Sequence, residues 1–294
     1  MTLDEALQGV IPPLITPLTE DGRLDEPGFL RQARRCLDAG CTGLFTSGST
    51  GEGPWLDAAQ RRRVVELAVG TGATTLAGVM LPGTRDTIGA ALQAQEAGAQ
   101  AVAVAAPYYF ESGEAAIVRH VTAVADSIQV PIVLYNIPQM THNPFTTGVV
   151  RALAEHPRVV GIKDSSGDRD LFRSYLTFAG DHGLRVLQGD ESWMGDSLRA
   201  GADGLIPGTA NVAPGVFVAL RRAVAAGDRS AADRAEEAVA ALMSLPAGTP
   251  YVAAVKSACA TLDVCGPTPA APGQVATEEQ ATRIGAVLSR LSLR

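Results

Sequence analysis

The sequence contains little lysine, cysteine or histidine. Of its 24 basic residues two are lysines and 22 are arginines, and it has four cysteines and four histidines. The cysteines form no Cys-x-x-Cys pair and the histidines form no His-Glu-x-x-His run, so neither motif encodes a redox centre or a zinc site. We therefore expect reduced, buried thiols and an enzyme or binding protein without a metal or other cofactor.

Excess positive charge and long hydrophobic runs are also missing. The 31 acidic residues outnumber the 24 basic ones and give a net charge of −7, which disfavours binding to nucleic acid or to an anionic membrane. No apolar run approaches the roughly 20 residues that span a bilayer. The first residues are acidic where a signal peptide would be basic. We expect a cytoplasmic protein with no nucleic-acid or membrane partner.

The two lysines are conspicuous because drift toward arginine codons would replace any lysine whose role arginine can fill. Arginine cannot replace an amine that must lose its proton and attack a carbonyl, because a guanidinium stays protonated. Lys163 and Lys256 are therefore candidates for such chemistry.

Short apolar segments alternate with longer amphipathic ones up to residue 226. The predicted strands are 10–18, 43–46, 75–80, 101–105, 132–136, 159–163, 185–188 and 204–206. The predicted helices are 27–39, 57–69, 84–97, 113–127, 146–155, 168–179, 191–200 and 214–226. Eight strand and helix units with nearly continuous apolar strands are typical of a parallel sheet that is buried on both faces.

A weak repeat favours closure of this sheet into a barrel. Segments 38–44, 96–102 and 199–205 each join a helix end, a C-cap glycine and the start of a strand, at about 26 to 29 residues per unit. The sequence has no Gly-x-Gly-x-x-Gly run, which disfavours an open dinucleotide-binding sheet. We predict an α/β fold, a (β/α)8 TIM barrel over residues 1–226. Three further helices, 231–245, 251–263 and 277–291, predict a C-terminal helical extension over 227–294 that forms a cap or an oligomer interface.

Lys163 ends the apolar segment 159–162 and so lies at the carboxyl end of a strand, where barrel enzymes place their active sites. Burial between the barrel walls disfavours the charged ammonium and makes Lys163 a candidate Schiff-base nucleophile. The alternative is a structural pair with Asp164. Lys256 lies in a helix among alanines, and we expect its ammonium to reach the surface.

Other strand ends carry further polar candidates. Tyr135 either relays protons or packs at the barrel mouth. Tyr108 and Tyr109 follow the preceding strand and are predicted to lie on the same face. Residues 47–53 form a loop of glycine and hydroxyl residues that either cradles a carboxylate or phosphate or is only a turn.

The loops after the last two predicted strands complete the rim of the barrel. Asp190 and Glu191 follow the strand at 185–188 and either bind hydroxyl groups or cap the next helix. Residues 208–211 follow the strand that ends at Ile206.

Four ordered motifs resemble the dihydrodipicolinate synthase and N-acetylneuraminate lyase family. They are Gly48-Ser49-Thr50-Gly51-Glu52, Pro107-Tyr108-Tyr109, Tyr135-Asn136-Ile137-Pro138 and Gly161-Ile162-Lys163-Asp164. The resemblance runs from about residue 9 through the helical tail. It implies a pyruvate-dependent class I aldolase, or a related lyase or dehydratase, on a (β/α)8 barrel with C-terminal helices. It also implies a homotetramer built as a dimer of dimers.

The resemblance implies a role for each matched residue. Lys163 would form the Schiff base with C2 of pyruvate, and Tyr135 would shuttle protons. Ser49 and Thr50 would bind the carboxylate beside Gly48 and assist the relay. Tyr109 would reach the neighbouring subunit's site across a tight dimer. Apart from these matches, we expect Ile206 and Met140 to complete the substrate-binding set together with Asp190 and Glu191.

Departures from the family pattern bear on the substrate. In the synthase an arginine, two residues after the proline of the Tyr-Asn-x-Pro motif, grips a carboxylate. Here Met140 takes that place, and a thioether cannot replace a guanidinium. The relay residue Ser49 is serine as in the lyase branch, where an acidic pair like Asp190 and Glu191 holds a sugar-acid tail. Residues 163–166 resemble those of 2-keto-3-deoxy sugar-acid aldolases.

We therefore favour a lyase that makes or breaks a carbon-carbon bond between pyruvate and an aldehyde, acting on a 2-keto-3-deoxy sugar acid. The alternatives within this chemistry are 4-hydroxy-tetrahydrodipicolinate synthase and a 2-keto-3-deoxy sugar-acid dehydratase. Outside it, the chain would be a phosphate-binding or catalytically silent barrel. Only the imine-forming hypotheses require an amine at position 163.

Overall fold

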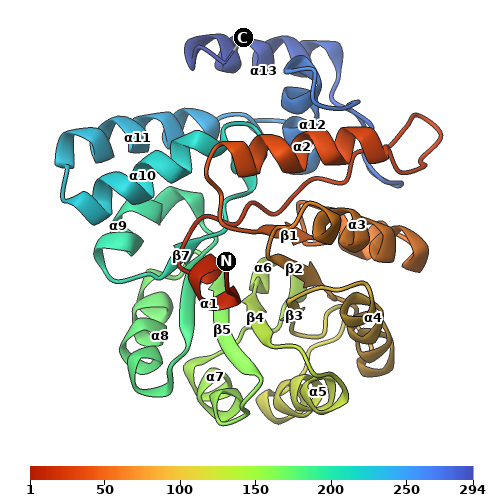
Figure 1. The fold of residues 1–294 in the computed structure, drawn as a ribbon, viewed down its shortest axis with the longest axis vertical. Helices are drawn as coiled ribbons and strands as arrows, with labels where there is room; N and C mark the ends of the chain where they lie inside the picture. The colour runs from red at the N-terminus through yellow and green to blue at the C-terminus, as the bar shows by residue number, and fades with distance from the viewer. Residues whose placement is uncertain (294) are drawn as a thin grey trace.

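A computed structural model describes residues 1–293 as a parallel sheet curled into a barrel and surrounded by helices (Figure 1). The strands follow one another in space as they do in sequence, and every neighbouring pair is parallel. They are β1 (Leu44–Thr46), β2 (Thr75–Gly78), β3 (Ala101–Ala105), β4 (Ile132–Asn136), β5 (Val159–Asp164), β6 (Arg185–Gln188) and β7 (Gly204–Leu205). Each lies within a predicted strand, give or take one residue.

The predicted strand 10–18 is wrong as a continuous strand. This segment lies between β7 and β1, where it forms isolated bridges at Val10 and Pro13. Pro12, Pro13 and Pro17 have no backbone N–H to donate, so a regular ladder cannot run along the segment.

A side chain supplies part of the missing ladder. Asn211, at the end of the 3-10 turn η3 (Gly208–Asn211), accepts the N–H of Ile15 at 3.0 Å and donates to the carbonyl of Pro13 at 2.8 Å. The barrel therefore closes through an amide side chain as well as through backbone bridges.

The outer helices follow the strands as the alternation predicts. They are α2 (Glu26–Asp38), α3 (Ala58–Gly70), α4 (Thr84–Glu96), α5 (Glu114–Ser127), α7 (Thr147–Ala154), α8 (Arg169–His182), α9 (Met194–Arg199) and α10 (Pro214–Ala226). The predicted helix 191–200 begins as the 3-10 turn η2 (Glu191–Trp193), and η1 (Gly53–Trp55) follows β1. None of the helices within residues 1–293 is both long and apolar enough to cross a bilayer.

Two short helices were not predicted. In Figure 1, α1 (Leu3–Leu7) lies across the near mouth of the barrel, and its Leu7 packs into the barrel interior with Ile11 and Phe45. The other, α6 (Pro138–Thr141), follows β4 directly and carries Met140. Helices this short lack the periodicity that marks the longer ones in the sequence.

The repeated helix-to-strand segments form the predicted turns. Gly40, Gly98 and Gly201 have φ angles of 96°, 92° and 106°, in the left-handed region that glycine enters without steric cost. They end α2, α4 and α9, and each leads into the next strand of the barrel.

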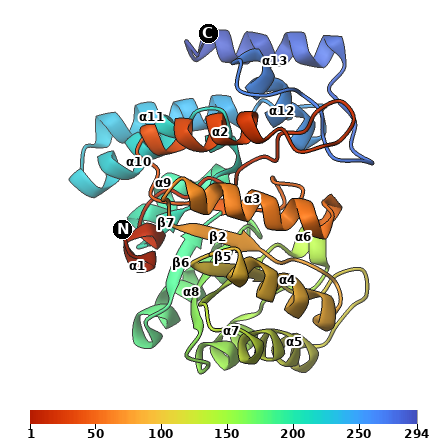
Figure 2. The same ribbon diagram turned by 45° about the vertical axis from the view of Figure 1, so that its right-hand side comes forward.

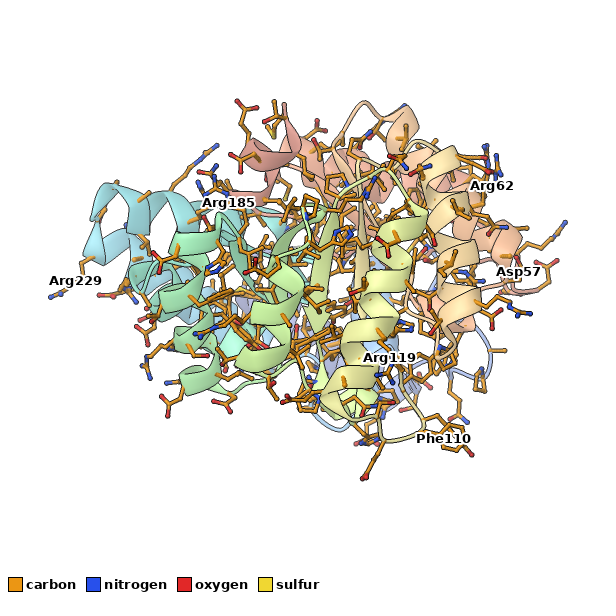
Figure 3. The ribbon with its side chains drawn as sticks, turned by 90° about the horizontal axis from the view of Figure 1, so that it is seen from below. Asp57, Arg62, Phe110, Arg119, Arg185 and Arg229 are labelled. Carbon is orange, nitrogen blue, oxygen red and sulfur yellow. The ribbon has the colours of Figure 1, made fainter. Side chains whose placement is uncertain are left out.

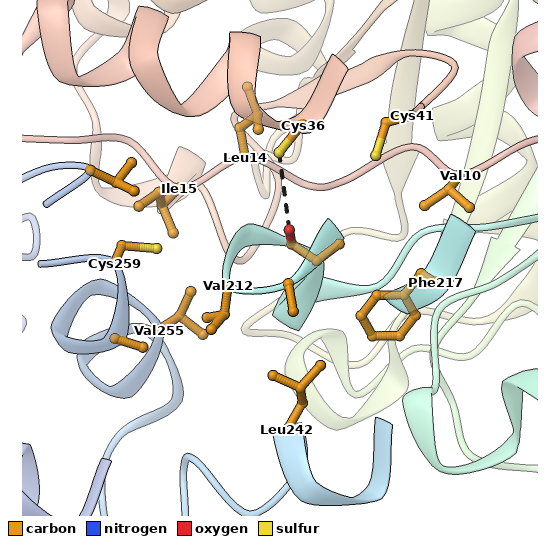
Figure 4. Packing of buried hydrophobic residues seen from close by; sticks show 14 of the residues in the cluster. Val10, Leu14, Ile15, Cys36, Cys41, Val212, Phe217, Leu242, Val255 and Cys259 are labelled. Carbon is orange, nitrogen blue, oxygen red and sulfur yellow. Dashed lines mark hydrogen bonds between the residues drawn. The ribbon is translucent and has the colours of Figure 1, made fainter. Parts of the chain in front are cut away.

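Three C-terminal helices stack beyond α10 and α2 on one side of the barrel (Figures 1 and 2). They are α11 (Arg229–Leu242), α12 (Tyr251–Thr261) and α13 (Glu278–Arg290). One buried apolar cluster joins barrel residues such as Leu14 and Phe217 to Leu242 and Val255 of these helices (Figure 4). The cluster spans residue 226, where the sequence predicts the end of the barrel domain.

The four cysteines are free and buried, as predicted.

Candidate active site

Tyr135 and Lys163 lie side by side at the carboxyl ends of β4 and β5. The strand register pairs their Cα positions, and it pairs Lys163 in turn with Leu187 of β6. Tyr135 and Leu187 belong to the cluster of side chains that fills the barrel interior. Lys163 is 4% exposed, so its amine lies inside the barrel mouth, as the sequence predicts.

The Lys163 amine lies beside two aromatic rings. Nζ lies 4.1 Å from the ring centroid of Tyr135 and 5.1 Å from that of Phe45. The two rings meet edge to face with their centroids 6.1 Å apart. Among residues 1–293 no acidic side chain forms an ion pair with Lys163. The structural pair with Asp164 that the sequence left open is therefore not formed.

Space beside Lys163 depends on Gly189, which directly follows β6. A Cβ atom at this position would lie 2.1 Å from Oγ of Ser165 and 2.8 Å from Cε of Lys163. Any other residue would displace the lysine stem or the serine, so the glycine leaves the amine free to enter the cavity.

A buried polar network lies behind the lysine and fixes the ends of β4 and β5. Asn136 donates from Nδ2 to Asp164 at 2.7 Å and to the Tyr175 hydroxyl at 3.3 Å. The Ser166 hydroxyl donates to the second oxygen of Asp164 at 3.0 Å. Burial raises the pKa of Asp164 to about 6, although these hydrogen bonds favour its charged form. Asp164 is thus occupied with orienting neighbours.

The loop 47–53 passes over Phe45 and faces Tyr135. A Cβ atom at Gly48 would lie 2.9 Å from Cζ of Phe45, so the loop approaches the ring closely only because residue 48 is glycine. The Ser49 hydroxyl and the Tyr135 hydroxyl share a hydrogen bond of 3.3 Å. In the described part of the chain, the backbone N–H groups of Ser49 and Thr50 donate to no other residue. These donors and hydroxyls suit a carboxylate.

A cavity of about 480 Å³ opens above the lysine. Its lining includes most of the predicted site: Ser49, Thr50, Tyr135, Met140, Lys163, Asp190, Glu191 and Ile206. Of the remaining predicted residues, Gly48 lies within the loop 47–53 and packs against Phe45, and Tyr109 lies outside the cavity lining. Over residues 1–293, no three His, Cys, Asp or Glu side chains gather in a way that would hold a metal ion.

Both members of the acidic pair have protein partners. Glu191 accepts hydrogen bonds from the N–H and the hydroxyl of Thr209, and burial raises its pKa. Asp190 accepts from the N–H of Ser192 at 3.0 Å and from its hydroxyl at 2.9 Å, so it caps η2. Capping was one of the two alternatives for Asp190. The binding of substrate hydroxyls by this pair stays a prediction.

Tyr251 is a site residue that the sequence analysis missed. It begins α12, lines the cavity, and donates its hydroxyl to Oε1 of Glu191 at 3.3 Å. A Cβ atom at Gly208 would lie 2.0 Å from this hydroxyl, so that glycine makes room for the phenol. The only sign in the sequence was a tyrosine at the start of a predicted helix, with nothing to show that the helix reaches the barrel mouth.

Tyr109 lies away from the cavity on the loop after β3. It is 81% exposed, has a φ of 80°, and packs edge to face with Phe110 at a centroid distance of 4.9 Å. Figure 3 shows Phe110 projecting at the opposite end of the molecule from Arg185, which begins β6, so this loop lies at the carboxyl end of the barrel, as predicted. Tyr109 does not line the cavity that contains Lys163, and its role in a neighbouring subunit stays a prediction.

Lys256 is fully buried, so the prediction of a surface ammonium is wrong. It is 0% exposed, forms an ion pair with Glu52, and donates to the carbonyl of Thr268 at 2.8 Å. The alanines and valine around it pack into the core, so α12 has no solvent-facing side at this position. A charge in such a place needs a partner.

Comparison with known proteins gives consistent matches along nearly the whole chain. The sequence profile described as the dihydrodipicolinate synthetase family matches residues 6–291. The putative 2-dehydro-3-deoxy-D-gluconate aldolase YagE of Escherichia coli K12 is 34% identical over 276 residues, which are 88% of this chain and 87% of YagE. A 4-hydroxy-tetrahydrodipicolinate synthase of Acidiphilium cryptum is 36% identical over 225 residues, 75% of this chain and 76% of that protein.

The solved structure of YagE in complex with pyruvate superposes with a TM-score of 0.93 at 32% identity, over 97% of this chain and 99% of that one. This likeness confirms the predicted barrel with C-terminal helices.

Proposed function

The chain belongs to the dihydrodipicolinate synthetase family and is a pyruvate-dependent lyase of the aldolase type, and we propose that it acts through an imine on Lys163. The observation that carries the proposal is a buried amine at a strand end, in a cavity, beside aromatic rings and without an ion pair to any carboxylate of residues 1–293. Such an amine is free to attack a carbonyl. The YagE complex supports pyruvate as the 2-oxo acid.

Imine formation accounts for the lysine. Nζ attacks C2 of the 2-oxo acid, the carbonyl oxygen leaves as water, and a protonated imine remains. Its positive charge then accepts the electron pair of the C3–C4 bond. As that bond breaks, the hydroxyl on C4 loses its proton and becomes an aldehyde, leaving the enamine of pyruvate on Lys163. Protonation at C3 and hydrolysis release pyruvate, and the reverse sequence joins pyruvate to an aldehyde.

The hydroxyl chain beside the lysine handles the protons. Tyr135 is hydrogen-bonded to Ser49, and its ring contacts the Lys163 amine. A phenol in this place can take the proton of the C4 hydroxyl and return one later. The free N–H groups of Ser49 and Thr50 would hold the pyruvate carboxylate against this relay.

The outer part of the cavity suits a hydroxylated tail. Its lining includes hydrogen-bonding side chains of Gln139, Ser165, Ser166 and Tyr251, and within residues 1–293 no arginine lines it. A second carboxylate, as in aspartate semialdehyde, would find no guanidinium there. We therefore favour 2-keto-3-deoxy sugar acids. The synthase remains the second candidate because the Acidiphilium cryptum synthase is 36% identical.

The test is a panel of 2-keto-3-deoxy sugar acids assayed for pyruvate release, beside condensation of pyruvate with aspartate semialdehyde. We expect pyruvate from at least one sugar acid at a higher kcat/KM than the condensation. A faster condensation would overturn the substrate assignment. A dehydratase would release no pyruvate, since its product keeps every carbon atom of the substrate.

The exposed loop at Tyr109 and Phe110 underlies the proposed assembly. Two large exposed rings that pack edge to face are unusual on a monomer, and each can bury on the order of 150 to 250 Å² in an interface. We propose a homotetramer built as a dimer of dimers, in which Tyr109 reaches the neighbouring site. Light scattering at assay concentration tests this, and a fully active monomer would contradict it. Location in the cytoplasm stays a prediction.

A further inference from the structure

The buried ion pair between Glu52 and Lys256 has no part in the mechanism above. We propose that it is a positioning pair, which holds the loop 47–53 and helix α12, both of which line the cavity, in a fixed relation. The inference rests on the proposed function, because this loop is the one assigned to the pyruvate carboxylate.

Glu52 anchors the loop from within. Its carboxylate accepts the N–H of Ala270 at 2.7 Å and pairs with Lys256 through its other oxygen. Its backbone is left-handed, with a φ of 58°, and its N–H donates to the carbonyl of Ser49 at 3.1 Å. A shift of Glu52 would therefore move the carbonyl of Ser49, whose hydroxyl meets Tyr135.

Lys256 anchors the part of the cavity wall that α12 forms. It lies on α12, five residues after Tyr251, which begins the helix and lines the cavity together with Val252. Its ammonium reaches both Glu52 and the carbonyl of Thr268. One side chain thus joins the carboxylate loop, the segment around Thr268 and the helix that carries Tyr251.

Stability alone is a weak reason for such a pair. Burial lowers the pKa of the Lys256 ammonium and raises that of the Glu52 carboxyl, so each charge depends on the other to remain buried. Apolar residues in place of a buried pair are often neutral or stabilising. The pair instead controls geometry, because its hydrogen bonds fix the position of the loop 47–53 relative to helix α12.

The pair also explains why position 256 is lysine and not arginine. Two acceptors face this ammonium, the Glu52 carboxylate and the Thr268 carbonyl. A guanidinium would bring five N–H donors to the same enclosed place and leave several unsatisfied. Lys256 does not line the cavity, so it acts through the loop and the helix and not on the substrate.

The experiment compares Lys256→Met and the double variant Glu52→Gln/Lys256→Met with the wild type. The glutamine amide of the double variant keeps an acceptor for the Ala270 N–H while both charges are removed. We expect both variants to raise the KM for pyruvate about tenfold, equivalent to about 1.4 kcal/mol. Both should still be trapped by borohydride at saturating pyruvate, and the double variant should regain Tm lost by the single one.

Leu288→Ala is the matched control, because Leu288 is fully buried in α13 and does not line the cavity. It should lower Tm and leave KM unchanged. A wild-type KM in the double variant would show that the pair is only structural and overturn the inference. Should Lys256→Met not fold, the double variant decides the matter alone. Failure of the wild type to be trapped by pyruvate would instead overturn the proposed function, and this inference with it.

Discussion

The surroundings of the two lysines differ although both side chains are buried. Lys163 at the end of β5 contacts the rings of Tyr135 and Phe45 and opens onto a cavity. Lys256 in α12 is held by Glu52 and the carbonyl of Thr268 in a closed interior. Burial by itself therefore does not make a nucleophile. Within residues 1–293, the absence of a carboxylate ion-paired with Lys163 and the presence of space for a carbonyl carbon distinguish it from Lys256.

Removing the Tyr135 hydroxyl should have the largest effect, because it deletes the proton relay and keeps the ring beside Lys163. We expect Tyr135→Phe to lower kcat by about 10²- to 10⁴-fold, the usual contribution of a general acid or base. The control is Tyr175→Phe, since Tyr175 is fully buried and does not line the cavity. It should lose stability with a much smaller loss of kcat. Equal kcat values for the two variants would place the relay elsewhere.

Replacing each lysine by methionine tests whether the two ammonium groups differ in their ion-pair partners, because the two variants should differ in unfolding free energy. Lys256→Met leaves the Glu52 carboxylate buried without its partner, which should cost about 3 to 5 kcal/mol of unfolding free energy. Lys163→Met removes an unpaired buried amine and should be neutral or stabilising. Urea unfolding at one protein concentration measures both. Similar losses in the two variants would contradict the contrast between the sites.

Asp164→Asn tests the polar network behind Lys163 through the pH dependence of the unfolding free energy. Burial raises the Asp164 pKa from 3.8 to about 6 in the folded state. Protonated Asp164 therefore favours folding below about pH 4, and this contribution is lost as pH rises through 6. Relative to the variant, the wild type should lose about 2 kcal/mol between pH 4 and 6, out of about 3 kcal/mol over the whole titration. A difference that stays constant over this range would show that Asp164 remains ionised when folded.

Met140→Arg should have the smallest effect and concerns the substrate. Met140 is 64% exposed at the cavity mouth, so an arginine there can reach a second carboxylate with little strain. We expect a modest rise in the rate of condensation with aspartate semialdehyde and no change in borohydride trapping. Wild-type condensation at an ordinary enzymatic rate, about 1 to 1000 per second, would mean that another group already binds that carboxylate.

Local patterns made the barrel and the floor of the site predictable. Tyr135 and Lys163 each end an apolar strand, and parallel strands bring their carboxyl ends together at one edge. The segment 10–18 also reads as apolar, but its prolines prevent a ladder, and the amide of Asn211, far along the chain, completes the closure.

Contacts between distant segments were not predictable. Glu52 and Lys256 are more than 200 residues apart, and an alanine-rich helix around Lys256 looks the same whether it faces solvent or the core. Tyr251 was missed for the same reason, because it belongs to the site only through the packing of α12 at the barrel mouth. The proposed role of Tyr109 in a neighbouring subunit's site involves a second chain, so contacts within one chain do not predict it.

Borohydride reduction in the presence of pyruvate, followed by peptide mass mapping, tests the central claim most directly. Reduction converts an imine into a stable secondary amine and so marks the lysine that formed it. We predict one reduced pyruvyl group on the peptide that contains Lys163, none on the peptide that contains Lys256, and no label in Lys163→Arg. A label on the Lys256 peptide, or a label that persists in Lys163→Arg, would contradict the account.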